Sequence, residues 1–376
     1  MLSPRIEIVS VAIPFRHIFA HASAVRKQSE NVLVRLEDSD GLVGLGEGCP
    51  RDYVTGETVD GVRRFLEEEA SAIVAQARDL ADLRRWVHCN GGRIDRHPSA
   101  FCALEMALLD LFARREGVSV EGLLGVTPKR KPIKTTAVYG SSSGAAFAIQ
   151  YLRFGWAGMA DAKLKMTGNA SRDRRRAGLL TRRGRLRLDA NNLWPDEAGA
   201  ISALRNLEGL AWAVEEPVKP RDWHGMVAIA EACGMALILD ESFTTSADLL
   251  AVHEGPRWVA NCRVSKLGGV LRTLDAIAIA KERDIGLIVG AQVGETGILA
   301  RAGLLAASAI GADIEGFEGA YGTHLLASDM VEPTVTFDGR GEIFPSAFGS
   351  PGWGLSLSER ASSVRRCVSA QPRRAG

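Results

Sequence analysis

The sequence predicts a parallel (β/α)8 (TIM) barrel preceded by a smaller α+β module. From about residue 134, short apolar runs alternate with segments of helical pattern. Three of these runs end on an acid, Asp189, Glu215 and Asp240, in steps of 26 and 25 residues. A step of about 25 residues accommodates one strand, one helix and two short loops. The three acids are therefore expected at the same height on three consecutive strands.

The N-terminal part has the pattern of an α+β module. Residues 6–13 alternate loosely, and two apolar runs flank the residues 37–41, Glu-Asp-Ser-Asp-Gly, which form a hairpin turn signal. Two helical patterns follow, at 57–87 and 98–116, and the second carries a wide apolar face. We assign residues 1–130 to a capping domain.

The alternation that follows indicates eight strands with seven intervening helices, and hence a barrel domain over residues 131–325 with an altered last unit. The predicted strands are 135–139, 161–165, 186–190, 212–216, 237–241, 260–264, 286–290 and 313–317. The predicted helices are 143–154, 170–182, 196–208, 222–233, 246–254, 270–282 and 297–309. Asp196 and Ser246 are candidate N-caps for two of these helices.

After residue 325 the helical pattern fades, and Pro333, Pro345 and Pro351 occur among several glycines. This composition predicts that residues 326–376 return to complete the capping domain. The arginine-rich end is expected to be a solvated tail.

Composition restricts the class of protein. Apolar residues make up 46% and charged residues 24%, and the formal net charge is +1, so nothing favours nucleic acid or a membrane as partner. No apolar run reaches the roughly 18 residues of a membrane span, and the first residues lack signal-peptide order. The six cysteines contain no CxxC pair, which is consistent with the cytoplasm.

The acids at the strand ends predict a metal site. In barrels of this type the active site lies at the carboxyl ends of the strands. One acid there is most simply a structural ion pair, but three in register would repel one another without a cation between them. Oxygen ligands favour a hard cation, so Asp189, Glu215 and Asp240 predict Mg²⁺, with Mn²⁺ as a substitute. Asn191 and Asn192 follow Asp189, and either can support these ligands.

One step earlier, Lys163 and Lys165 end another strand. Their spacing of two places them on the same side of it. A lysine near a divalent cation and a second lysine has its pKa lowered towards that of a working base. This arrangement suggests proton transfer to or from an activated carbon acid.

These motifs resemble those of the enolase superfamily, and within it the muconate-lactonizing-enzyme subgroup, which includes dipeptide epimerases and acylamino-acid racemases. The Lys-x-Lys motif is Lys163-Leu164-Lys165, and the three metal-ligand motifs are Asp189-Ala190-Asn191, Glu215-Glu216-Pro217 and Asp240-Glu241-Ser242. The resemblance covers almost the whole chain. It implies that Mg²⁺ binds a substrate carboxylate while Lys165 removes the α-proton to give an enediolate. Lys163 is expected to stay charged and hold the carboxylate, Glu241 to support the ligands, and the protein to form homo-oligomers.

The chain departs from this subgroup at strand six. Aligning Gly268-Gly269 with the family's Gly-Gly puts Arg263 where a second catalytic lysine usually stands, with Lys266 three residues later. Arginine keeps its proton, so it cannot readily act as the base on the opposite face. This substitution favours reactions that need one base, such as cycloisomerisation or syn elimination. Strand seven supplies no histidine, which argues against the mandelate-racemase subgroup.

The capping module is expected to set specificity. Residues 17–27 and 48–56 occupy the family's two loop positions, and from the second loop Arg51 or Tyr53 can contact a substrate anion or ring. After strand eight, either Glu315 or Glu318 can face the mouth. By resemblance to dipeptide epimerases, Glu318 can bind a substrate ammonium group.

The sequence therefore predicts a Mg²⁺-dependent isomerase, a cycloisomerase or a racemase/epimerase, that acts on a small-molecule carboxylate. An acid-sugar dehydratase of the same superfamily is the first alternative. A non-catalytic, metal-dependent small-molecule binder is the second, and the intact Lys165 argues against it. Deuterium exchange at the α-carbon separates an enzyme from a binder.

Overall fold

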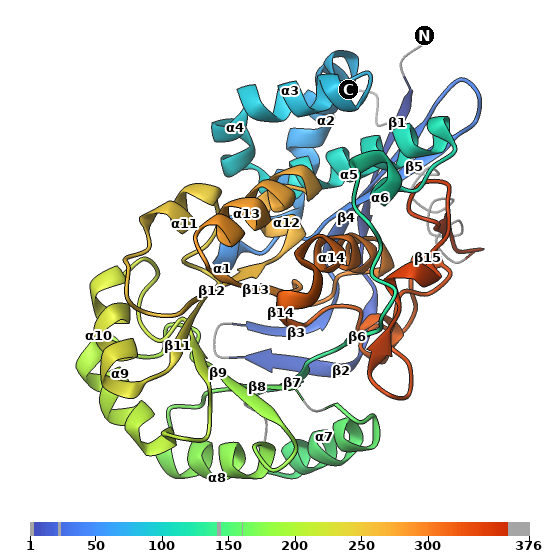
Figure 1. Ribbon diagram of the computed structural model, residues 1–376. Coiled ribbons are helices and arrows are strands. Elements are labelled where there is room, and N and C mark those ends of the chain that lie inside the picture. Colours follow the sequence, from blue (N-terminus) through green and yellow to red (C-terminus); the bar gives the residue numbers. More distant parts are fainter. Residues whose placement is uncertain (1–3, 22–23, 141–143, 160, 360–376) are drawn as a thin grey trace, which may run out of the picture.

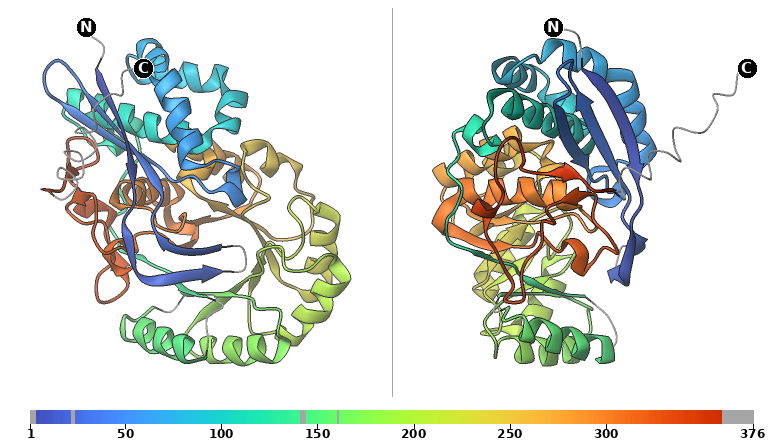
Figure 2. Two further views of the ribbon diagram at one scale, coloured as in Figure 1. Left: turned by 180° about the vertical axis from the view of Figure 1, so that it is seen from behind. Right: turned by 90° about the vertical axis from the view of Figure 1, so that its right-hand side faces the viewer.

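The computed structural model describes residues 4–21, 24–140, 144–159 and 161–359 (Figure 1). The N-terminal module contains an antiparallel sheet in the order β1-β4-β5, with helices packed against it. Its strands are β1 (Arg5–Val11), β4 (Asn31–Glu37) and β5 (Val43–Gly48). Its helices are α1 (Asp52–Thr55), α2 (Val59–Gln76), α3 (Leu80–Cys89), α4 (Gly91–Arg96), α5 (Pro98–Glu116) and α6 (Val120–Leu124). A hairpin of β2 (Pro14–His21) and β3 (Ala24–Gln28) extends from this module over the barrel (Figure 2).

Helix α5 packs unusually close to the sheet. Gly44, Gly46 and Gly48 occupy every second position of β5, on the face towards α5. A Cβ atom at these positions would lie 2.1, 2.0 and 2.2 Å from backbone oxygens of α5. Only glycine allows this approach, and it explains why nearly every residue of α5 is buried.

The second unit is a curled parallel sheet of eight strands in sequential order, as predicted. The strands are β7 (Ala137–Tyr139), β8 (Asp161–Lys165), β9 (Arg185–Asp189), β10 (Ala213–Glu215), β11 (Ala236–Leu239), β12 (Trp258–Cys262), β13 (Gly286–Val289) and β14 (Ile314–Phe317). The helices between them are α7 (Gly144–Trp156), α8 (Ala170–Leu180), α9 (Glu197–Leu204), α10 (Trp223–Cys233), α11 (Ser246–Ala251), α12 (Val264–Leu267), α13 (Val270–Glu282) and α14 (Gly297–Ile310).

The strand register brings the predicted site residues to one level. Lys165 is paired with Asp189, and Asp189 with Glu215. Glu215 is paired with Ile238, so Asp240 follows two residues beyond. The near-equal steps in the sequence thus correspond to adjacent strand ends.

The barrel has a weak seam between β14 and β7, which share no ladder of hydrogen bonds in the described residues. The Thr136 N–H donates to Phe317 O at 2.7 Å. The Tyr321 hydroxyl accepts from Val138 N at 3.1 Å and donates to Thr136 O at 2.7 Å, so a side chain bridges the seam. A short 3-10 turn (Gly322–His324) follows β14 in place of an eighth long helix, which confirms the altered last unit.

The C-terminal segment returns to the N-terminal module, as predicted. Trp353 is fully buried, and its indole N–H donates to Leu45 O at 3.1 Å and Met106 O at 3.3 Å. Strand β15 (Val331–Glu332) pairs with β17 (Ser356–Leu357), and β16 (Glu342–Ile343) pairs with β6 (Ile133–Lys134). The predicted solvated tail lies outside the described residues, and the domain limits at 130 and 325 stay a prediction.

Two local predictions were wrong. The helix expected over 57–87 is two helices, α2 and α3, because Asp79 has extended backbone and caps a new start by accepting from Asp82 N. Ser246 is the first residue of α11 and not its cap. Thr245 is the N-cap and forms a capping box with Asp248. Asp196 caps α9 as predicted, accepting from Gly199 N at 2.8 Å.

Among the helices that the structure describes, none is both long and apolar enough to cross a membrane. Of the described cysteines, Cys49, Cys102, Cys233 and Cys262 are buried and Cys89 is exposed, and all five are free thiols.

Candidate active site

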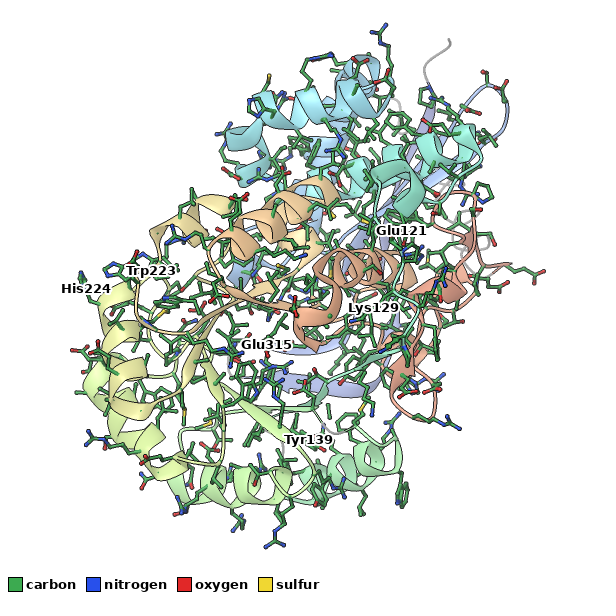
Figure 3. The ribbon with its side chains drawn as sticks, viewed as in Figure 1. Glu121, Lys129, Tyr139, Trp223, His224 and Glu315 are labelled. Carbon is green, nitrogen blue, oxygen red and sulfur yellow. The ribbon has the colours of Figure 1, made fainter. Side chains whose placement is uncertain are left out.

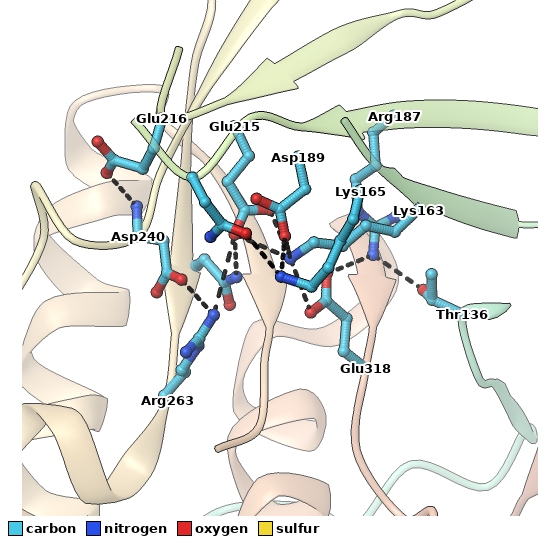
Figure 4. A network of polar contacts seen from close by, with 12 residues as sticks. Thr136, Lys163, Lys165, Arg187, Asp189, Glu215, Glu216, Asp240, Arg263 and Glu318 are labelled. Carbon is cyan, nitrogen blue, oxygen red and sulfur yellow. Dashed lines mark hydrogen bonds and ion pairs between the residues drawn. The ribbon is translucent and has the colours of Figure 1, made fainter. Parts of the chain in front are cut away.

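A cavity of about 630 Å³ opens at the carboxyl ends of the barrel strands. Its lining includes most of the predicted site residues, namely Tyr53, Lys163, Lys165, Asn191, Glu241, Arg263 and Glu318. The side chains of the strand ends form one continuous network of ion pairs and hydrogen bonds (Figure 4).

Lys163 lies inside a cage of carboxylates. Its Nζ atom is 2.8 Å from Glu215 Oε2, and 3.2 Å from both Asp189 Oδ2 and Glu318 Oε2. Burial opposes the charge, but the three carboxylates outweigh it and raise the pKa of Lys163 well above its usual range. Lys163 therefore remains a cation, which suits it to hold an anion and not to accept a proton.

Lys165 lies at the cavity surface. Its Nζ atom donates to Asn191 Oδ1 at 2.8 Å and to Asp189 Oδ2 at 3.0 Å. The side chain is 12% exposed, whereas that of Lys163 is 2% exposed, so Lys165 is the more accessible lysine of the pair. Asn191 has a left-handed backbone with φ of 46°, a conformation that asparagine tolerates better than most residues.

The three predicted metal ligands are fully buried. Burial opposes ionisation of Asp189, but Lys163 and Lys165 hold its pKa well below the usual range. Burial opposes ionisation of Asp240 too, and Arg263 and Lys266 outweigh it, lowering the pKa of Asp240 to about 2. The pKa of Glu215 is raised well above its usual range by burial, with the neighbouring acids adding to the effect. Such crowding of acids is relieved by a cation.

The donor chemistry of these residues fits a hard divalent cation. Asp189 Oδ1 is a buried oxygen atom without a hydrogen-bond partner. As the side chains lie, however, no group of three acidic, histidine or cysteine residues in the described chain encloses a metal position. Cations already pair with these acids: Lys163 contacts Asp189 and Glu215, and the Nη2 atom of Arg263 bonds Asp240 Oδ2 and lies 3.9 Å from Glu215 Oε1. A metal ion bound by Asp240 would share this carboxylate with the guanidinium group or displace it.

Arg263 follows β12 and also donates to Gln292 Oε1 at 3.1 Å. Burial opposes its charge, but Asp240 and Glu215 raise the pKa of Arg263 further above its usual range. Its guanidinium group is thus a permanent cation in the cavity wall.

Lys266 lies away from this cavity. Its Nζ atom is fully buried and donates to Asp240 Oδ1 at 2.9 Å and to the backbone oxygens of Asp240 and Asn261 at 2.7 and 3.0 Å. It belongs to α12 and faces a separate, smaller cavity of about 320 Å³. The predicted catalytic role of Lys266 is therefore not supported. The side chain instead makes structural contacts behind Asp240.

Of the two residues of the capping module that were predicted to contact substrate, one lines the large cavity and the other does not. Tyr53, on α1, lines the large cavity. Arg51 is fully buried, and its guanidinium group donates to the backbone oxygens of Glu30, Pro50 and Val293. The prediction that Arg51 contacts substrate is thus not supported, because the side chain is fully buried and both of its Nη atoms donate within the protein.

Of the two acids near strand eight, Glu318 faces the site. It accepts from Arg187 Nη2 at 2.9 Å in addition to its contact with Lys163. Burial opposes its ionisation, but these two cations lower the pKa of Glu318. Glu315 (labelled in Figure 3) stands near the start of β14 and pairs with Arg185 at the start of β9 and with Arg257, so it lies at the opposite end of the strands. Glu241 supports the ligands only weakly, since Asn191 Nδ2 donates to it at 3.5 Å.

Sequence reasoning missed three residues of this network. Arg187 is fully buried and bonds Asp161 at 2.7 Å as well as Glu318. Asn261 Nδ2 donates to Glu215 Oε1 at 3.2 Å, and Gln292 holds Arg263. Arg187 and Asn261 each stand two residues before a predicted site residue, so strand alternation could have found them. Nothing in the sequence marks Gln292.

The chain matches two family models. Residues 5–125 match the mandelate racemase / muconate lactonizing enzyme N-terminal domain, and residues 149–361 match the enolase C-terminal domain-like model.

The proteins similar to this chain include dipeptide epimerases and a muconate lactonizing enzyme. An aromatic dipeptide epimerase from Herpetosiphon aurantiacus is 30% identical over 76% of this chain and 80% of its own length. Muconate lactonizing enzyme from Pseudomonas fluorescens, solved with muconolactone, has a TM-score of 0.83 and 25% identity, covering 96% of this chain and 98% of its own. A dipeptide epimerase from Methylococcus capsulatus, solved with Mg and the dipeptide L-Arg-D-Lys, has a TM-score of 0.83 and 25% identity, covering 95% and 100%.

Proposed function

We propose, from the premise that this chain belongs to the mandelate racemase / muconate lactonizing enzyme family of the enolase superfamily, a one-base reaction at the α-carbon of a small-molecule carboxylate. The chain is an isomerase of that superfamily. In the proposed reaction Lys165 is the only base. The observation that carries this proposal is Arg263 on the opposite side of the cavity.

Lys165 is suited to remove the proton because it is the more accessible lysine and, among the described residues, forms an ion pair with one carboxylate only, that of Asp189. Lys163, enclosed by three carboxylates, stays charged and stabilises negative charge that develops on the substrate. A positioned base contributes roughly 10²–10⁴-fold to the rate. Mg²⁺, or Mn²⁺ in its place, held by Asp189, Glu215 and Asp240, would supply several kcal/mol of charge stabilisation.

Arg263 limits what the site can do. Its strand, β12, is four strands from β8, so in a barrel of eight it stands across from Lys165. Two-base racemisation needs a group on that side that both gives and takes a proton, and an arginine does not. A cycloisomerase reaction needs only one base. A syn elimination, the dehydratase alternative, fits the same arrangement. A non-catalytic binder has no use for an accessible Lys165.

The test is α-proton exchange in D2O with Mg²⁺, followed by NMR. The probes are N-acetyl-L- and N-acetyl-D-phenylalanine, with L-Ala-L-Phe and L-Ala-D-Phe as dipeptides. We expect deuterium to enter one enantiomer of a pair and not the other, and EDTA to stop it. Rapid exchange of both enantiomers would refute the one-base reaction and restore racemisation or epimerisation. Absence of exchange across the panel would contradict α-proton abstraction from these classes of acid.

The proposal also includes the cellular compartment and the oligomeric state. The free, mostly buried cysteines support a reducing compartment such as the cytoplasm. Homo-oligomers are supported by Trp156 at the end of α7, a large apolar side chain that is 83% exposed. Light scattering of the purified protein tests this expectation, and a mass of one chain would contradict it.

A further inference from the structure

The large cavity continues well beyond the reaction centre. From Lys163 and Lys165 it extends to α7 on one side and to the segment 318–339 on the other. Its volume of about 630 Å³ is within the range of pockets that enclose drug-sized ligands. A carboxylate group and its α-carbon would fill only a small part of it.

The open seam of the barrel explains this extension. In a regular barrel an eighth helix would pack beside α7 and cover the junction of the last and first strands. Here a 3-10 turn and irregular chain follow β14, and the Tyr321 hydroxyl bridges the junction. Space therefore remains between α7 and the returning chain, and it is continuous with the catalytic lysines.

The walls of this space are mainly apolar and aromatic, with Gln150 and Arg153 of α7 and Asp338 as polar members of the lining. Phe154 on α7 packs edge-on against Tyr139, with ring centroids 5.2 Å apart. On the other wall Tyr321 and Phe337 meet edge-on at 5.4 Å, and the His324 ring stacks on Phe337 at 4.1 Å. The polar atoms of this second wall are used internally, since His324 Nε2 bonds Phe337 O at 3.1 Å. Ring faces and edges are therefore what this wall offers to a ligand.

We propose that this space, the seam pocket, receives the apolar substituent of the substrate. It is formed by Ala146, Ile149 and Phe154 of α7 and by Ala320, Tyr321 and Phe337. The substrates are then carboxylates that carry a long aliphatic or aromatic group beyond the α-carbon. The inference rests on the proposed function for the position of the carboxylate, next to the two lysines.

The test uses a homologous series of probes: phenylacetate, 3-phenylpropanoate, 4-phenylbutanoate and 6-phenylhexanoate, titrated calorimetrically into the full chain with Mg²⁺. Each methylene group that enters the pocket should lower Kd about three- to fourfold, until the pocket is filled. A Kd that does not change along the series would overturn the proposal.

Two variants on α7 form a matched pair. Ala146 lines the cavity, whereas Ala148 is exposed on the same helix and does not line it. Ala146→Phe should remove the dependence on chain length while phenylacetate binds as before. Ala148→Phe should retain the full dependence. Equal behaviour of the two variants would contradict the pocket assignment.

A second pair covers the case in which Ala146→Phe does not fold. Ile149 is 65% exposed at the rim of the cavity, and Leu152 is 50% exposed on the same helix but outside the lining. Ile149→Asp should weaken 6-phenylhexanoate at least tenfold and phenylacetate little, whereas Leu152→Asp should leave both unchanged. Equal effects of the two aspartates would refute the pocket.

The exchange assay separates this inference from the proposed function. Length-dependent binding without α-proton exchange of the phenylalanine probes would support the pocket and contradict the reaction. Exchange without length dependence would support the reaction and contradict the pocket.

Discussion

Buried carboxylates occur in two regions of this molecule, and their partners differ. At the barrel mouth Asp189, Glu215 and Asp240 are held by side-chain cations, and Asp189 Oδ1 has no hydrogen-bond partner. At the contacts around the capping module, Glu47, Glu57 and Glu105 are held by backbone N–H groups at helix starts.

The second set is fully satisfied. Glu105 on α5 accepts from Val270 N at 2.5 Å and Leu271 N at 3.0 Å, at the start of α13. Glu47 accepts from Thr296 N and Leu299 N at the start of α14, both within 3.0 Å. Each acid thus caps a helix that belongs to a different part of the chain.

The difference separates chemistry from architecture. Lysine and arginine side chains can move when a metal ion or substrate arrives, so acids held by them can change partners. Backbone N–H groups of a packed helix cannot move, so acids held by them fix how two units pack. Changes at the mouth should therefore remove activity, and changes at the capping contacts should lower stability.

The largest effect is expected for Lys165→Ala. Loss of a positioned base should slow α-proton exchange by at least about 10²–10⁴-fold while the fold stays intact, since the side chain lies at the cavity surface. NMR exchange rates and circular dichroism check this, with the exposed Lys219→Ala as control. Exchange that survives the change would assign the base to another group.

Asp240→Asn should weaken Mg²⁺ binding and turnover together by more than about 100-fold, because loss of a residue that merely supports a metal ligand costs 10–100-fold. Calorimetry with Mg²⁺ measures the affinity, and EDTA followed by Mg²⁺ should abolish and restore activity. The exposed Asp284→Asn is the control. Unchanged Mg²⁺ affinity would remove Asp240 from the ligand set.

Arg263→Lys should reduce turnover roughly 10-fold or more, since one charge-assisted hydrogen bond is worth about 1.5–3 kcal/mol and lysine lacks the planar fork. It should also open exchange from the second face, because a lysine can release its proton. The D2O assay on both enantiomers measures each effect. Undiminished turnover with exchange still confined to one face would mean that Arg263 takes no part in the reaction.

Glu105→Ala should lower the free energy of unfolding by about 2–4 kcal/mol, because two buried N–H groups lose their acceptor. The activity of each folded molecule should be retained. Denaturant unfolding and exchange rates measure the two quantities. Glu116→Ala, an exposed change on the same helix, is the control. A loss of activity without a loss of stability would break the distinction between the two regions.

The smallest effect concerns pH. Burial raises the pKa of Glu105 from its ordinary 4.5 to about 8, although two backbone hydrogen bonds oppose the shift. The folded state thus holds this proton more tightly than the unfolded state. This tighter proton binding stabilises the folded state. The stabilisation is complete below pH 4.5 and is lost as the pH rises through 8. Over that range the stability of Glu105→Gln should decline less steeply than that of the unmodified protein, and equal slopes would contradict the assignment.

The sequence by itself determined the barrel and the level of its site. Strand alternation and near-equal steps are local properties, and they were sufficient to bring Lys165, Asp189 and Glu215 into register. The exchange of a second lysine for Arg263 was also visible in the sequence, because two glycines fix its place. Even the missing eighth helix followed from the loss of helical pattern.

Tertiary structure alone decided which of the charged side chains reach the cavity. Arg51 donates to the backbone oxygens of Glu30 and Val293. Lys266 lies in a helix and not in a strand, so its side chain contacts Asp240 from the side away from the cavity. The pairing of Glu318 with Arg187 spans 131 residues of chain. Such contacts, like the seam pocket, depend on how distant segments pack, and no local periodicity encodes that packing.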